Sequence, residues 1–257
     1  MTLDNIRARA VGRYRRLAST SLFRNPVRMR NETPIISFTF DDFPRSAFYT
    51  GGTILKSHGF RGTYYAAFGL TDTVEPVGEI FSREDLMKLV ADGHELGCHT
   101  FGHCHSWNTT PAAFERSIVD NALRLREWVP ETSFKTLAYP LAGPRPNTKR
   151  RAARHFSCCR AGGQTYNVGV VDRALLSAYF LEQAKDTDSV KAIIDQNSGA
   201  RGWLIFATHD VCEGASRWGC SPGFFEDVVR HALRSGATVL PVGKAWDVVR
   251  GLPYNCE

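Results

Sequence analysis

Acidic and imidazole side chains follow three separate apolar runs of this sequence. Asp41 and Asp42 follow the first run, His99 follows a later one, and His209 follows the most apolar one. Carboxylates and imidazoles bind divalent cations and transfer protons during hydrolysis. If the fold brings the three segments together, these side chains can form a metal-dependent hydrolytic centre.

A second histidine, His103, lies four residues after His99. On a helical turn this spacing places both rings on one side, as two ligands of one ion require. With one carboxylate, the pair would leave open positions for water and substrate, as catalytic zinc sites do. The adjacent carboxylates of Asp41 and Asp42 repel each other, and a nearby cation would relieve that repulsion. The histidine spacing alone is weak evidence, and its context gives it weight.

The elements that must position these residues alternate between strands and helices. Runs of β-branched and aromatic residues predict strands, and capping residues predict the starts of helices. No internal repeat or linker interrupts the series, so it predicts one α/β domain with a parallel sheet, either open or closed into a barrel. The carboxyl ends of such strands form one face, where active sites collect. The predicted strands are residues 35–40, 63–68, 95–98, 136–139, 155–159, 203–207 and 237–240, and the predicted helices begin at Ser82, Thr110, Asp188 and Ser221.

Positive charge is concentrated at the start of the chain. Residues 1–31 hold eight arginines and one acid, a charge of +7, so residues 32–257 sum to −1 within the total of +6. A neutral body argues against a broad nucleic-acid-binding face. We therefore divide the chain into a basic amphipathic segment, residues 1–31, and a single catalytic domain, residues 32–257. The apolar residues at helical spacing in the first segment are Leu3, Ile6, Ala10, Tyr14 and Leu17.

A basic amphipathic helix is solvated, packs on the body of the protein, or lies on an anionic membrane surface. No apolar run is long enough for a transmembrane helix, and the basic start lacks the apolar core of a secretory signal. The seven cysteines are an odd number, which favours free thiols in a reducing cytosol over a disulfide such as Cys212–Cys220. Cys98 and Cys104 flank the histidine pair, so a structural zinc site is an alternative there, although no second ligand pair accompanies them.

Four segments resemble motifs of the polysaccharide deacetylases, the NodB-like enzymes of carbohydrate esterase family 4. Residues 38–42 resemble the first motif, and residues 93–103 are similar to the second, which carries the H-[ST]-x-x-H metal pair. Residues 137–140 resemble the third motif only in part, and residues 205–209 resemble the fifth. The motifs occur in the family's order along the chain.

The resemblance implies a distorted, incomplete (β/α) barrel of about seven strands and a metal-dependent N-deacetylase. It implies that Asp42, His99 and His103 bind one divalent ion, zinc in the first place, with cobalt or nickel as alternatives. By the same analogy Asp41 is the general base and His209 the general acid. The implied substrate is an N-acetylated sugar, oligosaccharide or polysaccharide precursor, which would yield acetate and a free amine.

The surroundings of Asp41 depart from the family pattern. Phe43 and Pro44 stand where many members have glycine, which predicts a narrower groove. Ala138 stands where the third motif commonly has an arginine that pairs with the base. We expect Arg160, at the end of a strand-like run, to supply this cation; an ordinary surface ion pair is the alternative.

Other residues are expected to support the site. Thr100 would form a hydrogen bond across its loop and orient His103, and Asp172 would steady His209. The backbone N–H of Leu141 would share the oxyanion with the metal. The remaining residues expected around the substrate are Tyr139 and Pro140.

Two other functions stay open: hydrolysis of a cyclic amide or imide on the same fold, and glycan binding without catalysis. The presence of both a base and an acid favours an enzyme. Because no export signal is recognisable, we expect a cytoplasmic protein acting on a lipid-linked, nucleotide-linked or oligosaccharide intermediate. The basic segment, residues 1–30, would suit peripheral contact with a membrane. The sequence predicts no oligomeric state.

Overall fold

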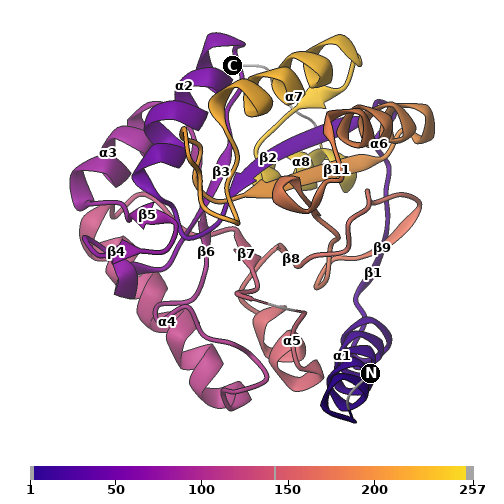
Figure 1. Ribbon diagram of the computed structural model, residues 1–257. Helices are drawn as coiled ribbons and strands as arrows, with labels where there is room; N and C mark the ends of the chain where they lie inside the picture. Colours follow the sequence, from indigo (N-terminus) through magenta and orange to yellow (C-terminus); the bar gives the residue numbers. More distant parts are fainter. Residues whose placement is uncertain (1–2, 142, 253–257) are drawn as a thin grey trace.

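One eight-stranded parallel sheet forms the centre of the computed structural model, which describes residues 3–141 and 143–252. The sheet curls into an incomplete barrel with helices around its outside (Figure 1), as the family resemblance implies. Its order is β10-β11-β2-β3-β6-β7-β8, and β12 pairs with β2 beside β3. The strands are β2 (Ile35–Phe40), β3 (Thr63–Ala66), β6 (Glu95–Cys98), β7 (Thr136–Ala138), β8 (Cys158–Arg160), β10 (Tyr179–Phe180), β11 (Trp203–Thr208) and β12 (Thr238–Val239).

Helices with side-chain caps follow the strands. Ser82, Thr110 and Ser221 each accept a hydrogen bond from the backbone N–H three residues later, so α3, α4 and α7 begin where the sequence predicts. Helix α6 begins one residue before the prediction, because Asp186 is its cap. The helices around the sheet are α2 (Thr53–Ser57), α3 (Arg83–Ala91), α4 (Pro111–Trp128), α5 (Pro146–Ala152), α6 (Thr187–Ala200), α7 (Pro222–Arg234) and α8 (Val242–Val249).

Shorter elements complete the fold. A π-helix, Ala47–Gly52, precedes α2, and two 3-10 turns cover Phe68–Leu70 and Leu181–Gln183. Two antiparallel ribbons lie outside the main sheet. They pair β1 (Pro26–Arg28) with β9 (Val170–Asp172), and β4 (Val74–Glu75) with β5 (Gly78–Glu79).

Strand β2 shows how the sheet aims its side chains. Phe38 and Phe40 belong to the large core beneath the outer helices. The intervening residues point into the barrel: the Ser37 hydroxyl accepts from the indole of Trp203 at 2.9 Å, and the Thr39 hydroxyl donates to a β11 carbonyl at 2.8 Å. Because side chains alternate along a strand, Asp41 is the next residue on the inner face. It lies at the carboxyl end of the sheet.

Helix α1 (Leu3–Ser21) lies against α5 at one edge of the molecule (Figure 1). Lys149 of α5 is fully buried, and its ammonium donates to the carbonyls of Ser19 and Leu22, at 2.7 and 3.0 Å. The same ammonium pairs with Asp172 at 2.6 Å. A cation at a helix C-terminus satisfies the unpaired carbonyls there. This buried pair therefore fixes the end of α1 to the body.

No helix among the described residues is long and apolar enough to cross a membrane. All six described cysteines are free thiols, Cys212 and Cys220 included, and Cys256 lies outside the described residues.

Replacing Lys149 by methionine should destabilise the protein strongly. The change leaves Asp172 buried without a cation, and breaking a buried pair in this way typically costs about 3–5 kcal/mol. The free energy of unfolding in urea measures the loss, and limited proteolysis should show α1 cut first. Lys191→Met is the matched control, because the Lys191 side chain is 40% exposed and lies 3.6 Å from Asp188; it should change the unfolding free energy by less than about 1 kcal/mol. Equal small effects of the two changes would contradict the anchoring role of Lys149.

Candidate metal centre and active site

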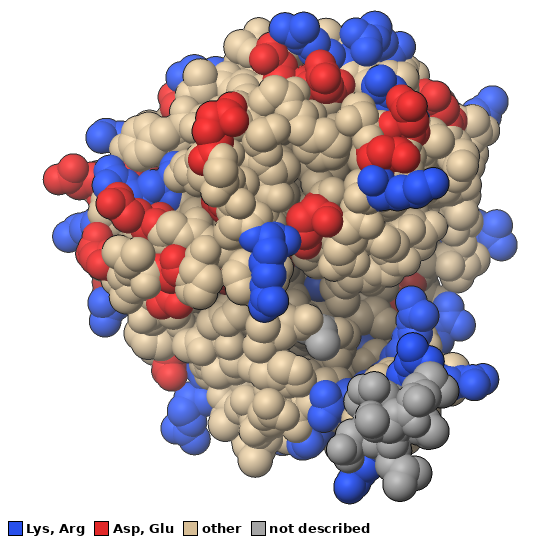
Figure 2. All heavy atoms as spheres, viewed as in Figure 1, with Lys and Arg blue, Asp and Glu red and all other residues tan. Residues whose placement is uncertain are grey.

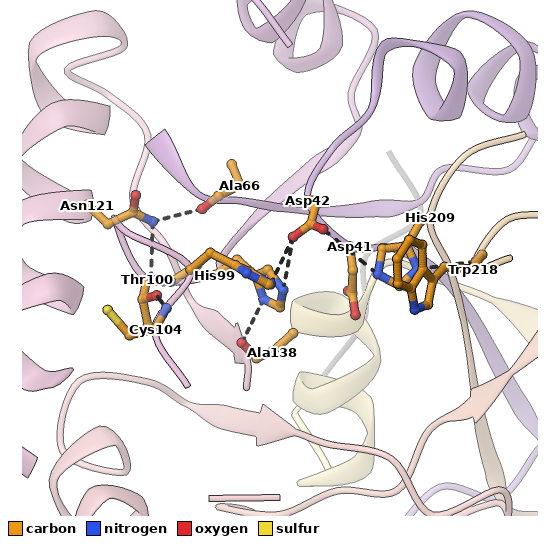
Figure 3. Close-up of polar contacts among 12 residues, drawn as sticks. Asp41, Asp42, Ala66, His99, Thr100, Cys104, Asn121, Ala138, His209 and Trp218 are labelled. Atoms are coloured by element: carbon orange, nitrogen blue, oxygen red, sulfur yellow. Dashed lines mark hydrogen bonds and ion pairs between the residues drawn. The ribbon is translucent and has the colours of Figure 1, made fainter. Parts of the chain in front are cut away.

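Asp42, His99 and His103 meet at the carboxyl ends of β2 and β6; Figure 3 shows the Asp42 carboxylate facing the ring of His99. Oδ1 of Asp42 lies 3.4 Å from Nε2 of His99 and 3.2 Å from Nε2 of His103, and the three ligand atoms are within 4.8 Å of one another. In a tetrahedral site with zinc bonds of about 2.0–2.1 Å, neighbouring ligand atoms are about 3.3 Å apart. The cluster therefore has the dimensions of a three-ligand metal site.

The protonation of these groups suits a metal ion. Burial lowers the pKa of His99 to about 3 and also lowers the pKa of His103, so both rings are neutral at neutral pH, as ligands must be. Burial raises the pKa of Asp42 to about 6; His209 opposes the rise, and the neighbouring Asp41 adds to it. Oδ1 of Asp42 is buried and receives no hydrogen bond from the described residues. A divalent cation is the kind of partner that this oxygen lacks.

Contacts behind the ligands fix their orientation. Nδ1 of His99 lies 2.9 Å from the carbonyl oxygen of Ala138; as a donor there, it leaves the Nε2 lone pair facing Asp42. The hydroxyl of Thr100 accepts from the backbone N–H of Cys104 at 2.9 Å and so closes the loop that carries His103.

Two of the three ligands, and Thr100 between the histidines, lie on strained backbone. Asp42, Thr100 and His103 have positive φ angles of 61°, 59° and 48°. This left-handed region is costly for residues other than glycine, most of all for β-branched Thr100. Such strain persists where surrounding contacts enforce it, and it concentrates at functional sites. Here it turns Asp42 out of the strand and toward the imidazoles.

Asp41 points into the barrel and meets Arg160 there. The Arg160 guanidinium is 1% exposed and donates from Nη2 to Oδ1 of Asp41. Burial by itself would raise the pKa of Asp41, but the Arg160 charge and hydrogen bond outweigh it and hold the pKa below its ordinary value. The guanidinium lies over the ring of Tyr65, 4.5 Å from its centre. A Cβ at Gly97 would clash with that ring, so only glycine leaves it room.

His209 lies on the other side of Asp42, with its Nε2 4.0 Å from Oδ2 of that carboxylate (Figure 3). Its Nδ1 lies 3.2 Å from the carbonyl oxygen of Trp218. Asp210, which follows His209 in the sequence, accepts from the backbone N–H and hydroxyl of Ser216 and shapes the loop that presents this carbonyl. The loop therefore orients His209.

The expected contact between Asp172 and His209 is wrong. Asp172 pairs with Lys149 and accepts from the backbone N–H of Asn25 at 2.9 Å, because β9 carries it to the junction with α1. The backbone carbonyl of Trp218 takes the place that a carboxylate was expected to fill.

The structure also changes the expected roles of two aromatic residues. Phe43 is fully buried and stacks on Phe81 at 4.7 Å, so it does not narrow the groove. Tyr139 follows the inward-facing Ala138 and therefore points outward, where its ring packs in the core. Pro140 is buried as well. Leu141 is 68% exposed at the end of the same segment, and its N–H as an oxyanion donor stays a prediction.

Cys98 and Cys104 take no part in the metal cluster. The sulfur of Cys98 accepts from the side chain of Asn121 in the core, and that of Cys104 contacts the hydroxyl of Ser117. A structural zinc site on these cysteines therefore finds no support among the described residues.

Glu182 carries a carboxyl group with one buried oxygen, and the sequence did not predict its role. Phe180 pairs with Ala207 across β10 and β11, and Glu182 and His209 each follow that pair by two residues, Glu182 in the 3-10 turn Leu181–Gln183. Oε2 of Glu182 is buried without a hydrogen-bond donor among the described residues, and burial raises its pKa to about 8, with Asp41 adding to the rise. A strand of two residues gives no periodic signal, which is why the sequence did not reveal this position.

The Glu182→Gln substitution should flatten the dependence of stability on pH. The folded pKa is raised, so the group's contribution is complete below its ordinary value of 4.5 and is lost as the pH rises through about 8. Glutamine stays neutral, so the unfolding free energy should fall less between about pH 5 and about pH 9 than in the wild type. Urea denaturation of the chelator-treated protein measures this. The exposed Glu131→Gln control should follow the wild type, and parallel curves for all three proteins would sink the prediction.

Comparisons with known proteins agree with this fold. A family model described as polysaccharide deacetylase matches residues 28–157, about half of the chain. No curated protein sequence matches the chain. Among solved structures, the Xyl-CE4 domain of a multidomain xylanase from the hindgut metagenome of Trinervitermes trinervoides superposes with a TM-score of 0.60 at 15% identity, covering 88% of this chain and 95% of that one.

Two further structures are similar. A family 4 acetyl xylan esterase from Clostridium thermocellum, solved with a cobalt ion, gives a TM-score of 0.59 at 18% identity, covering 85% of this chain and 93% of that one. The chitin deacetylase of the fungal pathogen Colletotrichum lindemuthianum gives 0.60 at 16%, covering 84% and 89%. At such identities these likenesses show the fold alone. The family model, however, spans the segment with both aspartates and both clustered histidines, and by that match this chain belongs to the polysaccharide deacetylase family.

Proposed function

We propose that this protein is a metal-dependent hydrolase that removes the acetyl group from an N-acetylated sugar, oligosaccharide or polysaccharide precursor. One observation carries the proposal: a buried carboxylate, Asp41, is kept ionised by Arg160 directly beside the Asp42, His99 and His103 cluster. A general base beside a set of metal ligands can activate a water molecule for attack. The family to which the chain belongs supports carbohydrate deacetylation.

Asp42, His99 and His103 would hold the ion, which supplies a Lewis acid for the acetyl carbonyl and lowers the pKa of a water molecule. Zinc is the proposed ion, because two imidazoles and one carboxylate suit it. Cobalt and nickel are alternatives, and one similar structure was solved with cobalt.

The chain's own residues then divide the proton transfers. Asp41 accepts the proton of the attacking water, and Arg160 holds the carboxylate ionised and oriented for this step. The carbonyl of Trp218 keeps Nε2 of His209 directed toward Asp42. Protonated at Nε2, His209 donates to the departing sugar nitrogen as the C–N bond breaks. Acetate and a free amine are the products.

Removing a metal ligand should abolish both metal binding and acetate release. Asp42→Ala and His99→Ala each delete one of three ligands, whereas Asp41→Asn should keep the ion and lose about 10²–10⁴-fold in turnover. Metal content after dialysis and acetate release from N-acetylated chitooligosaccharides measure the two effects.

The control His231→Ala should keep both properties, because His231 lies on α7 and pairs with Asp195. Full acetate release by a ligand variant, or by the wild type after thorough chelation, would exclude the proposal. Hydrolysis of cyclic imides without acetate release would favour the alternative reaction on this fold.

The Arg160→Lys substitution should shift the pH dependence of catalysis. Lysine keeps the charge but lacks the planar fork, so it holds Asp41 less well. The pKa of Asp41 should then rise, and the acidic limb of the kcat/KM profile should move to higher pH, with kcat lower by about tenfold or more. Arg173→Lys is the control, because the Arg173 guanidinium donates to backbone carbonyls such as that of Ala153 and pairs with no carboxylate among the described residues. A profile identical to the wild type would show that Arg160 does not set the state of the base.

A further inference from the structure

Helix α1 carries an apolar stripe that the body of the protein leaves uncovered. The helix meets the body through Ala18 and Ser19, which are buried, and the Ser19 hydroxyl donates to the carbonyl of Pro144. Tyr14 and Leu17, three residues apart and so on a common side, are 65% and 55% exposed. Ala10 continues the stripe and is exposed too. The side chains of Leu3 and Ile6, which the sequence places on the same stripe, lie outside the described part.

Arginines border this stripe on α1 and on the neighbouring α5. Arg13, Arg16 and Arg24 are exposed along and just after α1, and Arg150 and Arg154 are exposed on and just after α5. None of the five pairs with a carboxylate among the side chains that the structure describes. Figure 2 shows Lys and Arg gathered around this end of the molecule, at the lower right, with few acidic side chains among them. We call the surface formed by Tyr14, Leu17 and the five arginines the α1 surface.

The α1 surface continues past the end of the helix. Leu22 and Phe23 are 51% and 43% exposed there, and the guanidinium of Arg150 lies 5.3 Å from the centre of the Phe23 ring. Large apolar side chains beside unpaired arginines match the two layers of a membrane interface, since apolar groups enter the acyl boundary while cations meet lipid phosphates.

The α1 surface adjoins the loop that carries a metal ligand. The rings of Tyr14 and Trp107 are 6.1 Å apart, and Trp107 lies four residues after His103. Arg15 and Arg145 both stack on the Trp107 ring, at 5.3 and 5.9 Å. The indole N–H of Trp107 donates to the carbonyl of Gly143 at 2.8 Å, two residues after Leu141. Contact with a surface at α1 would therefore bring that surface close to the catalytic mouth.

We propose that the α1 surface docks on an anionic lipid bilayer, with α1 lying in the interface beside the active site. A second copy of the chain fits this surface poorly, because the same unpaired arginines would face each other. This proposal narrows the substrate of the proposed function, and it rests on that function for the substrate class. The enzyme would deacetylate a glycan whose other end is held in the membrane.

Binding of the full-length, metal-loaded protein to vesicles tests the docking. The probes are vesicles of phosphatidylcholine alone and of phosphatidylcholine with roughly one-third phosphatidylglycerol. The wild type should bind the anionic vesicles at least about tenfold more tightly than the neutral ones, and added salt should weaken that binding. Equal binding to both kinds of vesicle would overturn the proposal.

Two pairs of substitutions separate charge from apolar contact, each with a matched control. Arg13→Glu with Arg16→Glu should lose about tenfold or more in binding to anionic vesicles, whereas Arg126→Glu with Arg234→Glu, the same charge change on α4 and α7, should lose much less. Tyr14→Ser with Leu17→Ser should also weaken binding, whereas Leu123→Ser with Leu233→Ser, two leucines that are each 51% exposed elsewhere, should not. Equal losses in a test pair and its control would overturn the docking site.

Two further measurements separate this proposal from its rivals. Turnover of a soluble N-acetylated chitooligosaccharide should be unchanged in Arg13→Glu with Arg16→Glu, because neither residue lies in the catalytic site. If the wild type binds anionic vesicles but releases no acetate from any substrate, the proposed function fails and the docking stands. A wild-type dimer that Tyr14→Ser with Leu17→Ser dissociates would show that a second copy covers the surface, and would overturn membrane docking.

Discussion

The arrangement of the whole site depends on two adjacent buried carboxylates at the end of β2. Burial by itself would raise the pKa of both Asp41 and Asp42, and repulsion from Asp41 adds to the rise at Asp42, so each carboxylate needs a partner that stabilises its charge. The structure gives each its own partner. The strand directs Asp41 inward to Arg160, and the left-handed backbone at residue 42 turns the second carboxylate toward His99 and His103. One carboxylate thus remains free to act as a base while its neighbour serves as a ligand.

The position of Arg160 explains how the site tolerates its unusual third motif. Ala138 and Arg160 are paired neighbours on the parallel strands β7 and β8, at the same height in the barrel and with both side chains facing inward. An arginine expected at residue 138 is therefore supplied from the adjacent strand. A small side chain at residue 138 fits this arrangement, as do Gly97 and the ring of Tyr65 beneath the guanidinium. The same charge reaches Asp41 from another segment of the chain.

The sequence predicted the parts of the fold that local chemistry determines. Capping residues such as Ser82 and Thr110 placed the helices, and β-branched runs placed the long strands. The sequence did not predict the roles of residues that depend on the direction of a side chain or that lie on or beside very short strands. Asp172 was expected near His209, but the short β9 takes it to α1, and Glu182 follows a strand of two residues. The ring of Phe43 turns into the core because the backbone at Phe43 is left-handed. No pattern in the sequence predicted that conformation.

Helix α1 is attached to the body by specific contacts, unlike a frayed terminus. A fully buried lysine, paired with Asp172, binds the last carbonyls of the helix, and Tyr14 reaches the loop beyond His103 through Trp107. Burying an ammonium is costly unless it is paired and fully hydrogen-bonded, so this junction specifies where the helix ends more than it adds stability. A helix held in one place, with its apolar stripe left in solvent, is poorly explained as packing for the core. It is better explained as a surface kept at a fixed distance from the metal ligands, so that whatever binds it is presented to Asp41 and His209 in one orientation.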